Sequence, residues 1–87
     1  MTWRVVFTRH ARKDARRLAE AGLKPKAQAL LAILAEDPHR IPPPFEKLIG
    51  DLTGACSRRI TIQHRLVYQI LEEEQVVKVL RMWTHYE

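Results

Sequence analysis

The second half of the chain alternates apolar and polar residues in the way that β-strands do. The alternating runs are ACSRRITIQ (55–63), RLVYQILE (65–72) and VVKVLRMW (76–83). Because successive side chains of a strand point to opposite faces, each run has one mainly apolar face and one mixed face. Short links between the runs favour antiparallel neighbours. A further apolar run, WRVVF (3–7), predicts a strand near the N-terminus.

Between the first strand and the later ones, apolar residues recur at helical spacing and predict two helices. The first helix, over residues 9–22, has a narrow apolar stripe made of Ala11, Ala15, Leu18 and Ala19. Thr8 can cap its start and Gly22 can end it. The second helix begins at Pro25 and ends before Pro38. Its apolar face consists of Ala27, Leu30, Leu31, Leu34 and Ala35.

This order of elements predicts an α+β fold. An N-terminal strand and an αα-hairpin precede three or four strands in sequence, so the hairpin is expected to cover one face of a small, largely antiparallel sheet. FEKLI (45–49) is the candidate for the additional strand, and it follows a triple proline that enforces an extended path. A chain of 87 residues can form one modest core, which predicts a single domain over residues 1–87.

The charge is concentrated in the first third of the chain. The net charge is +5, and residues 1–26 hold eight lysines and arginines against two acidic residues. Such a block is typical of a surface that meets an anionic partner, either nucleic acid or an acidic protein segment. An ordinary solvated helix face has the same composition, so charge alone leaves both interpretations open.

Several classes of protein are disfavoured by composition. A lone cysteine, Cys56, cannot form an internal disulfide, and the four histidines are too scattered to suggest a zinc site. The N-terminus lacks the pattern of a signal peptide, and the longest nearly uncharged run, AQALLAILA (27–35), is too short to span a bilayer. We therefore expect a cytoplasmic protein with no membrane contact and no metal or other cofactor.

One group of motifs points to a known family. FEKLIGDLTG (45–54), SRRIT (57–61), HRLVY (64–68) and the closing WTHY (83–86) stand at a fixed spacing. Over this half, the chain resembles the Txe/YoeB branch of the RelE-like bacterial toxins. The resemblance implies a RelE-like fold and a toxin of a type II toxin–antitoxin system. It also implies a metal-independent endoribonuclease that binds in the ribosomal A site, cuts mRNA there through attack by the 2′-OH, and inhibits translation.

The resemblance further implies partners and site residues. A cognate antitoxin would block the toxin with an acidic, otherwise disordered segment, and members of this branch can be homodimers. By position, Glu46 would be the general base, Arg65 would stabilise the phosphate, and His85 would be the general acid. Tyr86 would stack against the substrate or position it. The basic candidates for RNA contact are Arg59, Lys47, Arg58, Arg12, Lys13 and Arg16.

Three positions depart from the family pattern. Ile49 stands where a lysine is usual, Cys56 where an aromatic residue is usual, and Glu87 follows the His-Tyr pair. Lys47 is a doubtful substitute for the missing lysine, because adjacent strand residues point to opposite faces. These departures keep a second interpretation open, a non-catalytic basic module that binds RNA or antitoxin and acts in operon regulation. A DNA-binding regulator is disfavoured, because the link between the helices presents no obvious recognition helix.

Overall fold

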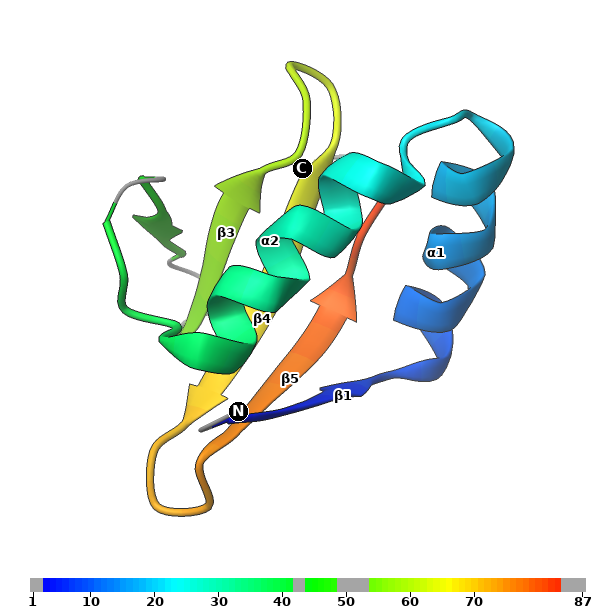
Figure 1. Ribbon diagram of the computed structural model, residues 1–87. Coiled ribbons are helices and arrows are strands. Elements are labelled where there is room, and N and C mark those ends of the chain that lie inside the picture. Colours follow the sequence, from blue (N-terminus) through cyan, green and yellow to red (C-terminus); the bar gives the residue numbers. More distant parts are fainter. Residues whose placement is uncertain (1–2, 42–43, 49–53, 84–87) are drawn as a thin grey trace.

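The protein forms one mixed sheet with both helices on the same side of it (Figure 1). The computed structural model describes residues 3–41, 44–48 and 54–83. In chain order the elements are β1 (Arg4–Phe7), α1 (Arg9–Glu20), α2 (Lys24–Glu36), β2 (Glu46–Lys47), β3 (Ala55–Arg59), β4 (Arg65–Leu71) and β5 (Val76–Arg81). The strand order is β1-β5-β4-β3-β2. This arrangement confirms the predicted α+β fold.

The sheet is antiparallel except at one edge. β2, β3, β4 and β5 pair antiparallel in turn, whereas β1 runs parallel to β5, with Val5 opposite Val77. The two paired strands are separated by most of the chain, so the local pattern that predicted each strand did not reveal that they are partners. The sheet is thus largely antiparallel, as expected, with one parallel pair.

The strands are shorter than the alternating runs that predicted them. β3 ends at Arg59 rather than at Gln63. The hydroxyl of Thr61 accepts hydrogen bonds from the backbone N–H groups of Gln63 and His64, each at 3.1 Å. A threonine that captures backbone donors in this way forms a turn, which ends the strand although the alternation continues.

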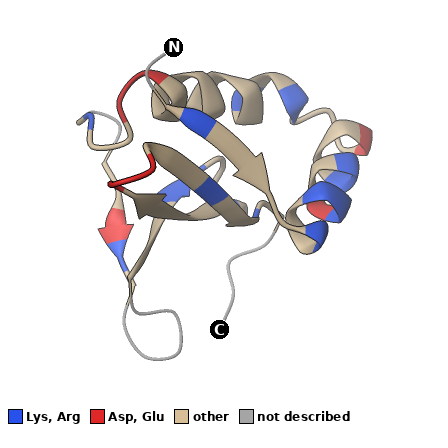
Figure 2. Ribbon diagram, turned by 90° about the horizontal axis from the view of Figure 1, so that it is seen from below, with Lys and Arg blue, Asp and Glu red and all other residues tan. Residues whose placement is uncertain are grey.

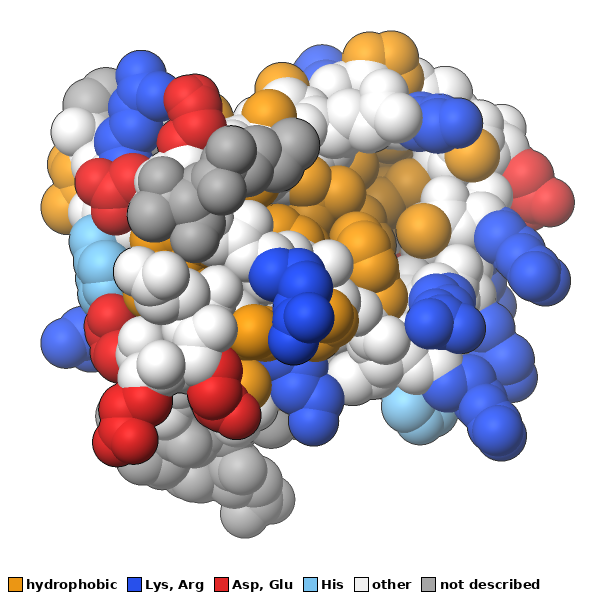
Figure 3. Space-filling model, turned by 60° about the horizontal axis from the view of Figure 1, so that its bottom comes forward, with side chains coloured by type: hydrophobic (Ala, Val, Ile, Leu, Met, Phe, Trp, Pro, Cys, Tyr) orange, Lys and Arg blue, Asp and Glu red, His pale blue; other side chains and the backbone are white. Residues whose placement is uncertain are grey.

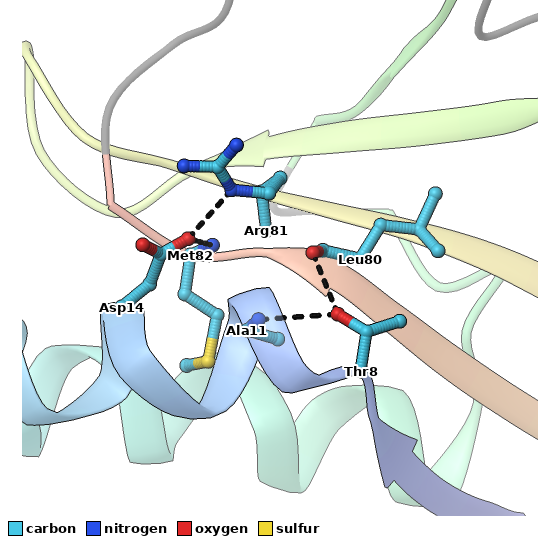
Figure 4. Close-up of polar contacts among 6 residues, drawn as sticks. All are labelled: Thr8, Ala11, Asp14, Leu80, Arg81 and Met82. Atoms are coloured by element: carbon cyan, nitrogen blue, oxygen red, sulfur yellow. Dashed lines mark hydrogen bonds and ion pairs between the residues drawn. The ribbon is translucent and has the colours of Figure 1, made fainter.

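The ends of α1 follow the predicted signals. Thr8 Oγ1 accepts a hydrogen bond from the N–H of Ala11 at 3.1 Å and donates one to the carbonyl of Leu80 at 2.9 Å (Figure 4). The cap therefore also ties the start of the helix to β5. Gly22 follows the helix with φ +77°, a left-handed conformation that costs glycine little.

The core lies between the helices and the sheet. Its most buried large side chains include Leu18 and Leu34 from the helices, and Leu66, Tyr68 and Val77 from the strands. No helix among the described residues is both long enough and apolar enough to cross a membrane.

Asp14 is a charged member of the otherwise apolar stripe of α1. It lies between Ala11 and Leu18 on the buried face and is 3% exposed. Its carboxylate accepts hydrogen bonds from Arg81 Nε at 2.9 Å and from the N–H of Met82 at 3.0 Å (Figure 4). The helix is thereby fastened to the end of β5.

Candidate functional site

The face of the sheet turned away from the helices carries a line of polar residues across three strands. Glu46 of β2 pairs with Ser57 of β3, and Arg59 of β3 pairs with Arg65 of β4. The residues that alternate with them, such as Leu66 and Tyr68, belong to the core on the helical side. Directly paired residues share a face, so the register places these four polar side chains together on this face, where Ser57 is buried and the other three are at least partly exposed.

Glu46 and Arg65 are in direct contact on this face. Arg65 Nη1 donates to Glu46 Oε1 at 2.6 Å and lies 3.5 Å from the hydroxyl oxygen of Ser57. The Glu46 side chain is 70% exposed and that of Arg65 is 26% exposed. A carboxylate that can accept a proton thus stands beside a guanidinium with further donors, and solvent reaches both.

Arg59 adds a second positive charge to the same place. It is exposed and lies directly opposite Arg65 in the β3–β4 register. Like charges on paired strand positions repel each other, and an anion bound between them would relieve this repulsion. The arrangement of Arg59 and Arg65 therefore suits a phosphate.

Lys47 does not join this group. It is exposed and pairs with Cys56, whose side chain packs in the core on the helical side. Lys47 consequently lies on the opposite face of the sheet from Glu46, as strand alternation requires. Lys47 is therefore not part of the site.

Arg58, a predicted RNA contact, is instead buried in the interior. Its side chain is 1% exposed, so a ligand outside the protein does not reach it in this conformation. Arg58 Nε donates to the Tyr68 hydroxyl at 2.9 Å, and Nη2 donates to the carbonyl of Pro38 at 2.9 Å. Its guanidinium carbon lies 4.9 Å from the centre of the Phe45 ring. Arg58 is an interior residue that joins several elements.

The C-terminal candidates, His85 and Tyr86, lie outside the described residues, as do Ile49 and Glu87. The last described residue, Trp83, packs against the ring of His64 with 4.5 Å between ring centres. The guanidinium of Arg17 lies 5.7 Å from the Trp83 ring. His64, which directly precedes β4, therefore supports the point at which the chain leaves β5.

The basic block of the sequence lies mainly on the exposed side of α1. All lysines and arginines of this helix are exposed. They are Arg9, Arg12, Lys13, Arg16 and Arg17. Because Asp14 faces the core, Glu20 is the only exposed acid that opposes them on α1. Figure 2 shows the resulting concentration of Lys and Arg on this helix.

An apolar groove runs between β1 and α2. Its volume is about 840 Å³, and its lining includes Trp3, Val5, Phe7, Leu31 and Ala32. A smaller hollow of about 330 Å³ between α1 and α2 shares Phe7 and Leu31 with it. Figure 3 shows a hollow of apolar side chains with basic residues around it. The basic residues that line the two hollows are Arg4, Arg16 and Lys24, and Glu74 also lines the larger one.

The described residues offer little for other site chemistries. No group of three or more His, Cys, Asp or Glu side chains suited to a metal ion occurs among them. Burial raises the pKa of the Cys56 thiol above its ordinary value, although Lys47 and Arg58 oppose the shift. Cys56 is therefore a protonated thiol at neutral pH and a poor nucleophile.

Comparison with known proteins identifies the family. The model of the YoeB-like toxins of bacterial type II toxin–antitoxin systems matches residues 7–86. Toxin YoeB of Streptomyces coelicolor is 38% identical in an alignment of 76 residues that covers 85% of this chain and 90% of that protein. The YoeB/ParE toxin from Agrobacterium tumefaciens superposes with a TM-score of 0.85 at 29% identity, covering 95% of this chain and 99% of that one.

YoeB of Staphylococcus aureus is also similar. Its dimer superposes with a TM-score of 0.80 at 28% identity, covering 99% of this chain and 100% of that one. Its complex with YefM gives a TM-score of 0.78 at 28% identity with the same coverage. The chain therefore belongs to the YoeB-like toxins of bacterial type II toxin–antitoxin systems.

Proposed function

We propose that this toxin is a ribosome-dependent endoribonuclease that cuts mRNA in the ribosomal A site without a metal ion and so inhibits translation. The observation that carries the proposal is the 2.6 Å contact between Glu46 and Arg65 on the open face. A carboxylate that can accept a proton and a guanidinium that can bind a phosphate lie side by side, which supports a role for both at one phosphodiester. Arg59, opposite Arg65, supports the proposal with a second cation.

In the proposed reaction the RNA supplies its own nucleophile. Glu46 takes the proton of the 2′-OH, and the 2′-oxygen forms a bond to phosphorus while the bond from phosphorus to the 5′-oxygen breaks. Arg65 and Arg59 donate hydrogen bonds to the nonbridging oxygens as negative charge develops. His85 gives a proton to the leaving 5′-oxygen. The products are a 2′,3′-cyclic phosphate and a 5′-hydroxyl.

The ion pair between Glu46 and Arg65 has to open when the substrate binds. A bound phosphate competes with the Glu46 carboxylate for the donors of Arg65. Once Arg65 turns to the phosphate, the Glu46 carboxylate is free to accept the proton of the 2′-OH. Tyr86 is proposed to stack on an unpaired substrate base, as aromatic residues commonly do with single-stranded RNA.

The basic side of α1 is the proposed contact to the ribosome. Arg12, Lys13 and Arg16 are exposed along it and can approach the phosphates of ribosomal RNA. Since the ribosome is the proposed site of action, the cytoplasm is the proposed location. A homodimer is proposed by analogy with the YoeB dimer of Staphylococcus aureus.

The apolar groove between β1 and α2 is the proposed binding site for the antitoxin. The YoeB-YefM complex of Staphylococcus aureus supports an antitoxin partner for this chain. Apolar side chains of an antitoxin segment can fill the groove, while its acidic residues face Arg4, Arg16 and Lys24 beside it.

A charge introduced into the groove should weaken this complex. Ala32 is exposed and lines the groove, so Ala32→Glu should raise the antitoxin Kd about 10- to 100-fold by placing a carboxylate against apolar side chains and acidic antitoxin residues. Calorimetric titration with the antitoxin encoded beside the toxin gene measures the change. Ala29→Glu is the matched control, because Ala29 is exposed on the same helix and does not line the groove. Equal Kd values for the two variants would contradict the assignment.

The proposed activity is tested by induced expression of the wild type, Glu46→Ala and His85→Ala, with growth followed and mRNA 5′ ends mapped. We expect the wild type to arrest growth and to produce new 5′-hydroxyl ends within translated frames. Both variants should lose at least about 10²-fold in cutting, the usual contribution of a general base or acid. Arrest without cuts would indicate inhibition by ribosome binding alone. Soluble wild type that causes neither effect would favour the non-catalytic binding module.

A further inference from the structure

Glu46 stands on a strand that does little to fix its position. β2 consists of Glu46 and Lys47 alone and lies at the edge of the sheet. Beyond this two-residue pairing, the N–H of Leu48 donates to the carbonyl of Ala55 at 2.9 Å. Edge segments with so few ladder contacts open easily. A general base must nevertheless stay within a fraction of an ångström of its working position, so further contacts are needed to hold β2.

Arg58 provides such a contact through the neighbour of Glu46. Since Glu46 pairs with Ser57, the same register brings Phe45 opposite Arg58, on the helical side of the sheet. There the guanidinium carbon of Arg58 lies 4.9 Å from the centre of the Phe45 ring. A cation over an aromatic ring is attracted to it, and more strongly where both are removed from water. Arg58 therefore holds the residue directly before Glu46.

Arg58 and Phe45, the residue directly before Glu46, together form a clamp. The other contacts of Arg58 attach this clamp to β4 and to the end of α2. Its Nε donates to the hydroxyl of Tyr68, a fully buried residue of the central strand β4. Its Nη2 donates to the carbonyl of Pro38, which follows α2. Pro38 and Phe45 bracket the segment that leads from α2 to β2. One guanidinium thus links the central sheet to both ends of the segment that carries Glu46 into the site.

We infer that Arg58 is a positioning residue, which sets the place of Glu46 opposite Arg65 from the far side of the sheet. The inference rests on the proposed role of Glu46 as the base. It assigns to Arg58 a function in turnover that does not require it to touch the RNA. A displacement of about 1 Å at a reacting group can cost on the order of 10²-fold in rate, so loosening β2 should be visible in the cleavage step.

Two variants remove the contact between Arg58 and Phe45, and a third keeps this contact while it removes one other partner of Arg58. Arg58→Met removes the guanidinium with little change in length, and Phe45→Leu removes the ring. Both should slow single-turnover cleavage of A-site mRNA on programmed ribosomes about 10- to 100-fold, with unchanged ribosome affinity. Tyr68→Phe removes only the acceptor of Arg58 Nε and leaves the contacts to Pro38 and Phe45. It should retain cleavage within about threefold.

A double-mutant cycle distinguishes positioning from general stabilisation. If Arg58 acts through Glu46, then Arg58→Met should have almost no further effect on cleavage in a Glu46→Gln background. A purely structural loss would lower the rate equally in both backgrounds. Arg58→Lys keeps a cation near Phe45 and should restore part of the rate. It also replaces Arg58→Met if the methionine variant does not fold.

Amide hydrogen exchange of the isolated toxin gives a readout that does not depend on activity. Exchange at Leu48 should be at least about tenfold faster in Arg58→Met and Phe45→Leu than in the wild type, with a smaller increase in Tyr68→Phe, which keeps the contact to Phe45. If the wild type does not cut RNA and Leu48 responds in this way, the proposed function fails while the anchoring of β2 by Arg58 stands. Unchanged exchange at Leu48, or equal losses of cleavage in both backgrounds of an active toxin, would overturn the inference.

Discussion

Arg65→Met should slow mRNA cleavage by about 10²- to 10³-fold, the largest effect expected from a single basic residue of this toxin. Arg65 is the proposed donor to the nonbridging phosphate oxygens, and loss of one such preorganised donor typically costs about 3–4 kcal/mol of transition-state stabilisation. Its Nη1 already lies 2.6 Å from Glu46, next to the proposed place of reaction. Single-turnover cleavage on programmed ribosomes measures the rate.

The stability of the Arg65 variant should change little. The ion pair joins a partly exposed arginine to a glutamate that is 70% exposed, and such pairs contribute about 0–1 kcal/mol to folding. Thermal unfolding therefore separates the loss of chemistry from a loss of fold. Arg65→Lys should recover only part of the rate, because an ammonium cannot present the planar fork that matches a phosphate. Cleavage by folded Arg65→Met within threefold of the wild type would remove Arg65 from the proposed mechanism.

Asp14→Ala should lower the free energy of unfolding by about 2–3 kcal/mol. The substitution leaves the N–H of Met82 without the acceptor that it has in the interior, and such a loss costs about 1–3 kcal/mol. It also removes the partner of Arg81, whose side chain is 44% exposed and can turn to water. For a chain of this size, the expected fall in Tm is about 10–20 °C. Chemical denaturation and calorimetry measure both quantities.

Two controls accompany this prediction. Asp14→Asn retains an oxygen that can accept from Met82, so its cost should be about half that of the alanine variant. Glu20→Ala removes an exposed carboxylate from the same helix and should change stability by at most about 0.5 kcal/mol. Equal stability of Asp14→Ala and Glu20→Ala would show that the contact between α1 and the end of β5 contributes nothing.

The elements that depend on neighbouring residues were predictable from the sequence. The Thr8 cap, the Gly22 stop and the apolar face of α2 are all set within one or two turns of chain, and the structure confirms them. The parallel pairing of β1 with β5 was not predictable in this way, because it joins segments about 70 residues apart. Nothing in the local pattern of either strand specifies its partner.

Charge was the least reliable guide to burial. Arg58 was predicted to contact RNA, and Asp14 entered only the count of charges in the N-terminal block, yet each is buried among partners contributed by distant segments. A signal was present in the spacing: Arg58 alternates with Cys56 and Ile60 on the apolar side of its strand. A charged residue at an apolar position of a periodic pattern is thus a candidate for a buried polar contact.

The candidate site was only partly accessible to sequence reasoning. The family resemblance put Glu46 and Arg65 forward, while their mutual contact depends on the pairing of three strands. The positioning role proposed for Arg58 cannot be inferred from the sequence. It depends on the contact between Arg58 and Phe45 on the side of the sheet opposite Glu46, which only the structure reveals.

The pairing of β1 with β5 has a consequence for synthesis of the toxin. Residues 4–7 leave the ribosome well before residues 76–79, which are their strand partner among the described residues, because about 70 residues lie between the two strands. Translation adds about 5–20 residues per second, so the N-terminal strand waits for several seconds before the sheet can close. During that time the nascent chain cannot complete its fold. The toxin therefore folds, and can begin its proposed action on ribosomes, only after β5 has been synthesised.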